Sequence, residues 1–507
     1  MSVTNTDFTP PQTTAGRRRR RMRRGLVGVG VTVAVVGAAA GTQVVVSALH
    51  RCGAGVTRQG DECVGVTDGS YVFDPALATV EGRIRAENHR VEDRPHVTVA
   101  LLTPLTSSAV STVSIERIRS QLEGAYVAQH SANSSGSNPR IRLVLANMGS
   151  QEQAWEPVVD QLADMVNGPQ HLVTVIGMGV SSDPTVRAAK ALAGHGIPMV
   201  GAVITGDGLN TTATGLGGPI PGLTRVNPSV GDELAVLAEY LTGHRRDLHT
   251  ALLVGDENSS DLYTGALQRD FTTTGLSRYW VDGGRVVQPY DGTPGTPGTD
   301  AQFRAIVANL CGVNPPDMVF YAGRASLLPT FVARLRQRNC ARDRIVTVVT
   351  GSDASALAAS LPRPQAVDAP VTVVYAPLVD PNALADRRFN PDLAQYQRFA
   401  DTFTTVNGFG ADDLADGWAI MTHDAMLAAT LAIGRATGQS SQLPATGDVR
   451  SLLYLANSPT TSVPGAGGTF TFDPKTGDAV GRRIPVMELR PDGSLTVLGT
   501  FPQPRAT

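Results

Sequence analysis

The chain has 507 residues, with 43 lysines and arginines against 45 aspartates and glutamates and a formal net charge of −2. This balance argues against a nucleic-acid-binding protein, which would carry a basic excess. The length is too great for one ordinary hydrophobic core and fits two lobes.

An arginine-rich block at 17–24 runs directly into an uncharged apolar stretch at 26–49. At about 1.5 Å per helical residue, this stretch is long enough to cross a hydrocarbon core of about 30 Å. Arginine clusters stay on the cytoplasmic side. We therefore expect a single-pass cell-membrane protein with a basic cytoplasmic tail at 1–25, a transmembrane helix at 26–49 and an extracytoplasmic bulk. The alternative is a signal peptide cleaved after Ala48. A lipid anchor on Cys52 is disfavoured by the preceding charge.

The chain continues with a mixed, polar segment at 50–95, which predicts an extracytoplasmic stalk. Four cysteines in an exported chain favour disulfides over metal. We expect two local pairs, Cys52 with Cys63 in the stalk and Cys311 with Cys340. The second pair follows two helical runs, whose ends meet at one edge of a parallel sheet. The alternative for these two is a pair of buried free thiols.

From residue 96 onward, short runs rich in Val, Ile and Leu alternate with longer amphipathic segments. Continuous apolar strands separated by helices predict an α/β fold with parallel-dominated sheets flanked by helices on both faces. The expected strands are Val97–Leu102, Ile141–Met148, Leu172–Met178, Pro198–Ile204, Ala251–Gly255, Met318–Tyr321, Ile345–Thr350 and Val371–Tyr375. An antiparallel hairpin is expected at 484–501.

Motifs for catalysis, metal and nucleotide binding are weak. Gly179–Asp183 approaches a hydrolase nucleophile turn but lacks the second glycine, and His423 fits an ordinary helix position. No paired Cys-x-x-Cys or His-Glu-x-x-His occurs. Asp416 precedes a helix, whose dipole a carboxylate complements. We therefore expect neither an enzyme nor a bound metal or cofactor.

The loops after three predicted strands are small and rich in hydroxyls. They contain Thr106, the pair Ser181 and Ser182, and Thr205. Ligands of open α/β sheets bind beyond the carboxyl ends of the strands, and free N–H groups at a helix start can hold a carboxylate. Ser181 and Ser182 also suit the capping of the next helix. Capping and binding are compatible.

The order of these elements resembles the type I periplasmic binding proteins, especially the branched-chain amino-acid binding family that serves ABC transporters. The resemblance covers roughly residues 96–501. It rests on several short segments, each weak alone, whose order and spacing agree: Ala100–Leu105, Ser181–Ser182, Gly196–Val200, Arg225–Pro228, Pro316–Gly323, Gly468–Asp473 and Gly477–Asp478.

The resemblance implies two lobes that close on a small molecule by a hinge motion. Lobe 1 would comprise 96–227 and 377–455, and lobe 2 would comprise 228–376 and 456–507. By position, Ser181, Ser182 and Thr205 would take a ligand carboxylate, and Asp353 would face its amino group.

Two departures from the family pattern disfavour an α-amino acid. Val230 stands where the family usually has an acid, and Arg324 stands where it often has an aromatic residue. Arg324 would compete for Asp353 and repel a cation. It is either a clamp for a carboxylate or another anion, or a surface arginine beside the hinge.

The leading hypothesis is a membrane-anchored protein or receptor that captures a small polar solute, an anion among the candidates, with an ABC permease or another membrane protein as partner. The alternative is a degenerate binding fold that mediates protein contacts at the cell surface. A polar cleft would favour the first, and an apolar cleft the second.

Overall fold

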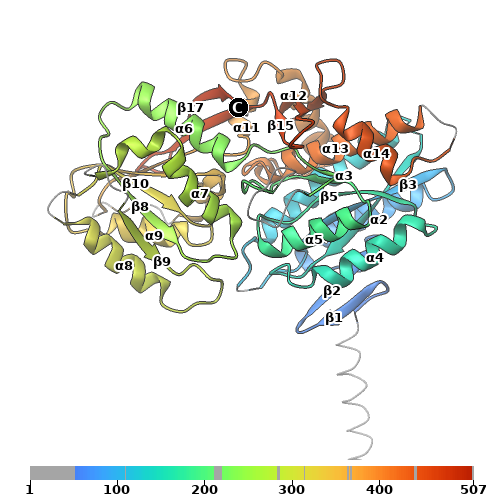
Figure 1. The fold of residues 1–507 in the computed structure, drawn as a ribbon, viewed down its shortest axis with the longest axis horizontal. Coiled ribbons are helices and arrows are strands. Elements are labelled where there is room, and N and C mark those ends of the chain that lie inside the picture. Colours follow the sequence, from blue (N-terminus) through green and yellow to red (C-terminus); the bar gives the residue numbers. More distant parts are fainter. Residues whose placement is uncertain are drawn as a thin grey trace, which may run out of the picture. The chain divides into compact units, whose positions relative to one another are not determined.

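The computed structural model describes residues 52–108, 110–136, 138–209, 220–281, 286–312, 315–361, 365, 368–438 and 442–504. Residues 54–507 form one compact unit. Within this unit the chain builds two α/β lobes, each around its own seven-stranded sheet (Figure 1). The expected two-lobed α/β fold with parallel-dominated sheets is confirmed.

The sheet of lobe 1 is parallel at its centre and antiparallel at one edge. In the central strand β3, every residue from Val97 onward is buried, because helices cover both faces. The spatial order is β1 (Val56–Gln59), β2 (Glu62–Thr67), β4 (Arg140–Asn147), β3 (His96–Thr103), β5 (Leu172–Gly177), β6 (Met199–Gly201) and β7 (Leu223–Arg225).

Two separate hydrophobic cores lie on the two faces of this sheet. One contains α2 (Ala78–Arg90) with the preceding 3₁₀ turn η1 (Pro75–Leu77), α3 (Ile115–Ser134), α13 (Trp418–Thr437) and α14 (Thr446–Tyr454). The other contains α4 (Trp155–Asn167) and α5 (Asp183–Gly194). The helices α3 and α13 approach so closely that a Cβ on Gly124 would lie 2.0 Å from the Ala419 carbonyl oxygen.

Lobe 2 repeats this plan, with five parallel strands and an antiparallel pair at one edge. The spatial order is β17 (Leu495–Pro502), β16 (Arg483–Leu489), β12 (Val371–Tyr375), β11 (Val346–Thr350), β10 (Met318–Ala322), β8 (Ala251–Asp256) and β9 (Val287–Tyr290). One core contains α6 (Val230–His244), α7 (Leu262–Thr273) and the turn η2 (Gly275–Tyr279). The other contains α8 (Thr299–Leu310), α9 (Leu328–Arg336) and α10 (Leu357–Ser360).

The chain passes between the lobes at 226–229, 376–380 and 481–482, which makes these segments the hinge. After its return to lobe 1 it forms further short elements. These are α11 (Pro381–Ala385), α12 (Leu393–Asp401), the π-helical turn η5 (Thr402–Val406), the 3₁₀ turn η6 (Ala411–Leu414), and a small sheet of β13 (Val463–Gly465), β14 (Gly468–Phe472) and β15 (Ala479–Val480).

Two expected boundaries differ from the structure. Residues 56–90 were expected in a stalk, but β2 pairs with β4 and α2 packs into the core of lobe 1. Residues 463–480 were expected in lobe 2, but Val463, Phe470 and Phe472 are buried in that same core of lobe 1. Both segments complete lobe 1 because their apolar residues find their partners there.

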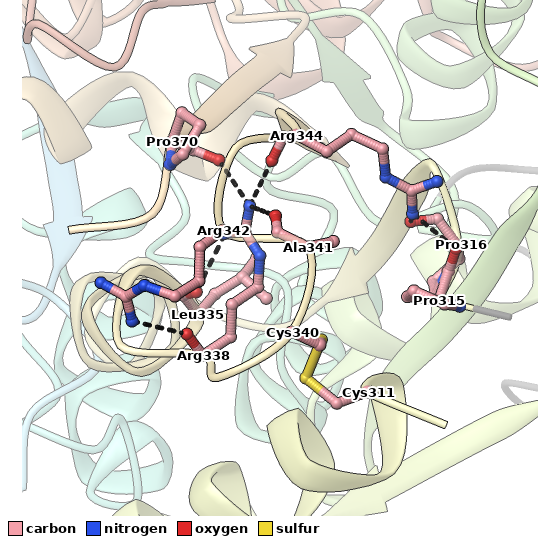
Figure 2. The surroundings of a disulfide bond; sticks show 10 residues. All are labelled: Cys311, Pro315, Pro316, Leu335, Arg338, Cys340, Ala341, Arg342, Arg344 and Pro370. Atoms are coloured by element: carbon pink, nitrogen blue, oxygen red, sulfur yellow. Dashed lines mark hydrogen bonds between the residues drawn. A yellow bond between two sulfur atoms is a disulfide. The ribbon is translucent and has the colours of Figure 1, made fainter. Parts of the chain in front are cut away.

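The predicted disulfide between Cys311 and Cys340 is present, with Cα atoms 5.5 Å apart (Figure 2). Beside it, Arg338 donates to the backbone carbonyls of Ala341, at 3.2 Å, and Pro370, at 3.1 Å, which ties the loop after α9 to the start of β12. Cys52 and Cys63 are also disulfide-bonded.

The predicted transmembrane helix at 26–49 and the tail at 1–25 lie outside the described residues. Among the helices that the structure does describe, none is both long enough and apolar enough to cross a membrane.

Candidate functional site

The loops after the parallel strands of both lobes meet in the cleft between the two lobes. The segments 181–183 of lobe 1 and 260–262 of lobe 2 touch directly through an antiparallel bridge between Ser182 and Asp261. The Asp183 amide donates to the Ser260 carbonyl at 3.2 Å, and the Leu262 amide donates to the Ser181 carbonyl at 3.2 Å. Backbone hydrogen bonds therefore join the two lobes at the inner end of the cleft.

Arg324, in the loop after β10, is buried at this inner end and is 8% exposed. Its Nε lies 2.6 Å from Oδ2 of Asp261, and its Nη2 lies 2.9 Å from Oδ1. Nη2 also donates to the Ser181 carbonyl of the opposite lobe at 3.0 Å. The interpretation of Arg324 as a surface residue is wrong, because a carboxylate and a carbonyl of the chain enclose its guanidinium.

A second buried arginine crosses the cleft in the opposite direction. Arg117, in the first turn of α3 in lobe 1, places Nη1 2.7 Å from Oδ1 of Asp353 in lobe 2. Its Nε lies 3.1 Å from Oδ2 of Asp416, and its Cζ lies 4.7 Å from the centre of the Trp418 ring. Arg117 thus binds a carboxylate of the opposite lobe, whereas Arg324 binds carboxylates of its own lobe and donates to the Ser181 carbonyl of the other.

Asp353 links the two arginines, since its Oδ2 lies 3.8 Å from Nη1 of Arg324. The order Asp416, Arg117, Asp353, Arg324, Asp261 gives a row of alternating charges, which we call the cleft ion row. Burial favours the neutral carboxyl of Asp353, but Arg117 and then Arg324 outweigh it, so the pKa of Asp353 is lowered.

Asp416 and Arg324 of the cleft ion row respond to burial in different ways. Burial raises the pKa of Asp416, and Arg117 only partly offsets this. Burial would lower the pKa of Arg324, but Asp261 and Asp353 raise it above its ordinary value. Both guanidinium groups therefore remain charged in the cleft.

The backbone around Asp353 is fixed by buried groups of lobe 2. The Ser352 amide donates to Oε2 of Glu233 at 2.9 Å, and the Asp353 amide donates to the Tyr263 hydroxyl at 3.1 Å. A Cβ on Gly351 would lie 2.8 Å from both acceptor atoms, so a glycine is needed there. Burial raises the pKa of Glu233 well above its ordinary value. These contacts hold Asp353 at the cleft in one orientation.

The structure brings some of the predicted hydroxyl-bearing residues close together. Oγ of Ser181 accepts from the Gly206 amide at 2.8 Å, next to Thr205, so the loops after β5 and β6 meet. Oγ of Ser182 accepts from the Thr185 amide at 3.3 Å and caps α5 as expected. Thr106 lies apart from them and donates to Glu62 at 2.8 Å. The binding roles of these residues stay predictions.

Sequence reasoning missed Glu152, which organises the serine loop. Its side chain accepts from the Val180 amide at 2.8 Å, from the Thr185 hydroxyl at 3.1 Å and from the Ser182 hydroxyl. It is 2% exposed, and burial raises its pKa despite these hydrogen bonds. Nothing in the local sequence marks this residue, because its partners lie 28 to 33 positions away.

A cavity of about 760 Å³ lies between the lobes beside the cleft ion row, and Arg117 and Asp416 of that row line it. Both lobes line it with hydroxyl groups: Ser108, Ser111 and Ser114 from lobe 1, and Ser326, Ser355 and Ser360 from lobe 2. The six predicted binding residues do not line it, although Ser107 and Ala325, which directly follow Thr106 and Arg324, do. The open part of the cleft is therefore displaced from the predicted position.

Charged residues of lobe 1 line one side of this cavity. Arg119 is bound to Asp413, with Nη2 and Oδ1 2.6 Å apart. Glu116 and Asp412 are exposed and add negative charge to the lining. Since the arginines of this side already bind carboxylates, the cavity favours a neutral or positively charged solute over an anion.

A second cavity, of about 730 Å³, lies on the hinge side, where α11, β14 and β16 meet. Its buried arginine, Arg482, binds Asp424 with Nη2 and Oδ2 2.9 Å apart. Val379 and Asp380, in the segment after the parallel strand β12, line it, but the six predicted binding residues do not. In the described part of the chain, no group of His, Cys, Asp and Glu side chains is arranged to hold a metal ion.

Comparison with solved structures gives many matches among ABC transporter substrate-binding proteins. One from Desulfitobacterium hafniense, in complex with leucine, matches with a TM-score of 0.56 and 18% identity over 80% of this chain and 100% of its own. LivJ from Streptococcus pneumoniae, a branched-chain amino acid transporter substrate-binding protein in complex with isoleucine, has a TM-score of 0.59 and 13% identity over 80% and 99%.

A solute-binding protein of an ABC transporter from R. palustris, in complex with benzoate, has a TM-score of 0.56 and 16% identity over 80% of this chain and 96% of its own. No family model and no curated protein matches the sequence. At these identities the likeness concerns the fold.

Proposed function

Because the chain has the fold of the type I periplasmic binding proteins, we propose that it captures a small polar solute outside the membrane. The observation that carries this proposal is the cavity of about 760 Å³ between the lobes, where hydroxyl groups from both lobes lie among apolar side chains such as Val113, Ile115 and Pro329. Its volume falls within the usual range of roughly 300–1,000 Å³ for small-molecule sites. Such a lining suits binding, because each lobe supplies hydrogen bonds that a solute completes on closure.

The solute is neutral or positively charged. The anion hypothesis rested on Arg324 as a clamp, and Arg324 already has Asp261 as a bidentate partner. The solved neighbours contain leucine and isoleucine, which carry no net charge, and benzoate, an anion that this charge preference would disfavour here. Two of these solved neighbours are binding proteins of ABC transporters. An ABC permease or another membrane protein would therefore bind the closed form of this protein or take up its solute.

The test is thermal unfolding of the full-length chain in detergent with a panel of amino acids, amides, sugars, amines and small carboxylates. A solute that binds the folded form raises the midpoint, by about 2.7 kcal/mol of stabilisation at a hundred times its dissociation constant. We expect a shift from one neutral or cationic class. A shift from carboxylates alone would contradict the proposed charge preference, and no shift across the panel would contradict solute capture.

A pair of variants on α10 locates the binding site. Ala359 lines the inter-lobe cavity, whereas its exposed neighbour Ala358 does not. Ala359→Trp should fill the cavity and abolish the shift, and Ala358→Trp should leave it intact. Loss of the shift in both variants would mean that the solute binds elsewhere.

The second candidate is a protein-interaction module at the cell surface. It is favoured by the direct contacts that join the lobes at the inner end of the cleft, which would hold one fixed shape. Surface binding that persists in Ala359→Trp would support it.

We also propose that residues 26–49 remain as an uncleaved membrane anchor, with the tail 1–25 inside. The basic block beside an apolar run of spanning length supports this. Mass spectrometry of the N-terminus of the membrane-bound protein tests it. A mature chain that begins after Ala48 would show a cleaved signal peptide.

A further inference from the structure

The guanidinium of Arg324 fills a cation site built from both lobes. The Asp261 carboxylate holds it through two hydrogen bonds, of 2.6 and 2.9 Å, and the Ser181 carbonyl accepts a third of 3.0 Å from the opposite lobe. The Tyr263 ring lies below it, with its centre 4.7 Å from Cζ. We call these three groups the arginine cage. A carboxylate, a carbonyl and an aromatic face are together the partners that a planar cation prefers.

The arginine cage is held in place by contacts that do not involve Arg324. Oδ1 of Asp261 caps α7 by accepting from the amides of Tyr263 and Thr264, at 3.0 and 3.1 Å. The Tyr263 hydroxyl accepts from the Asp353 amide, and the Ser181 carbonyl accepts from the Leu262 amide. Truncation of the arginine should therefore leave the three groups close to their present positions.

We propose that Arg324 is a tethered internal ligand: its guanidinium occupies a preorganised site for guanidinium-type cations and thereby joins the two lobes. The Arg324 side chain then occupies the inner end of the cleft and excludes external solutes from it. Solutes use the outer cavity, which Ala325 and Ser326 line directly after this arginine. The inference concerns what joins the lobes and does not depend on the proposed function.

Chemical rescue tests this inference. In Arg324→Ala, the arginine cage is vacated and the thermal midpoint of the full-length chain should fall. Millimolar guanidinium or ethylguanidinium chloride should then raise the midpoint in a saturable way, relative to sodium chloride of equal ionic strength. The wild-type chain should show no such rise, because its own guanidinium fills the arginine cage.

Arg269→Ala is the matched control. This arginine also faces the other lobe, with Nη2 3.6 Å from Oδ2 of Asp207, but half of its side chain is exposed and no cage encloses it. Rescue by guanidinium should be absent there. Equal rescue in both variants, or none in Arg324→Ala, would overturn the inference.

If Arg324→Ala does not yield folded protein, Arg324→Met replaces it, since a methionine keeps an apolar stem over the Tyr263 ring. The same saturable rescue is expected, and its absence has the same meaning. The solute panel on the wild-type chain is a separate measurement. A failed panel with successful rescue would reject solute capture alone, and the reverse would reject the internal ligand alone.

Discussion

Arg117 is buried between two carboxylates that belong to different lobes. Its side chain is 5% exposed and binds Asp353 and Asp416. Arg117→Met should destabilise the protein by about 3–5 kcal/mol, because it leaves Asp416 without its counter-charge and Asp353 with Arg324 alone. The free energy of unfolding from denaturant titration measures this cost.

Arg119 offers a control on the same helix. It binds Asp413 at 2.6 Å, but its side chain is 32% exposed. Arg119→Met should cost about 1 kcal/mol or less, since exposed ion pairs contribute little. Similar costs for the two variants would mean that burial does not set the energy of these pairs.

Among the individual residues of the candidate site, sequence analysis located only some. Asp353 was placed at the cleft through the family resemblance, which also singled out Arg324 as either a clamp or a surface residue. Arg117 was not singled out. Asp416 was interpreted as a carboxylate at a helix start, where it does accept from the Trp418 amide at 3.0 Å. The pairing of Arg117 with Asp416 spans 299 positions. A local pattern carries no information about such a contact.

The packing of α3 against α13 depends on a glycine. A Cβ on Gly124 would lie 2.0 Å from the Ala419 carbonyl oxygen, whereas a Cβ on Gly434, on an exposed side of α13, would meet nothing within 4 Å. Gly124→Ala should destabilise the protein by about 1–3 kcal/mol, because it forces the helices apart. Gly434→Ala should stabilise it by about 0.5–1 kcal/mol. Thermal unfolding of both variants measures this, and a gain from Gly124→Ala would contradict the packing.

Helix α3 also carries a buried carboxyl that makes stability depend on pH. Burial, and then the charge of Asp413, raise the pKa of Glu123 to about 8. The folded protein therefore holds a proton that the unfolded chain releases above its own lower pKa. The resulting stabilisation is present at low pH and is lost as pH rises through about 8.

Glu123→Gln should remove this dependence. The variant should be more stable than the wild-type chain at about pH 9, and the difference should shrink towards about pH 5. Unfolding titrations at several pH values measure it. Glu116→Gln, in the exposed first turn of the same helix, is the control and should leave the pH profile unchanged. A constant difference at all pH values would show that Glu123 does not cause the effect.

For the molecule as a whole, the alternation of strands and helices predicted parallel sheets, and the chain length and the family resemblance predicted two lobes. The run Val371–Tyr375 forms β12 with the expected bounds, because a continuous apolar strand has few alternatives. The hairpin β1–β2 was missed. Three of the four residues of β1 are exposed, so it lacks the alternation of a half-buried strand. Edge strands of this kind join a sheet through backbone pairing, which composition does not reveal.

The two lobes have separate cores, so loss of the cleft contacts should part the lobes without unfolding either. The amides of Asp183 and Leu262 donate across the cleft and report directly on its closure. In the double variant Arg117→Met with Arg324→Met, hydrogen exchange should accelerate at these two amides. Exchange in β3 and β10 should stay slow, because those strands lie in the lobe interiors.

Peptide-resolved hydrogen exchange by mass spectrometry gives this comparison, with the Arg119→Met variant as control. Faster exchange throughout both lobes would mean that the cleft ion row supports the fold itself. Unchanged protection at Asp183 and Leu262 would mean that the hinge segments alone hold the lobes together. Faster hydrogen exchange at Asp183 and Leu262 alone would show that Arg117 and Arg324 hold the two lobes together.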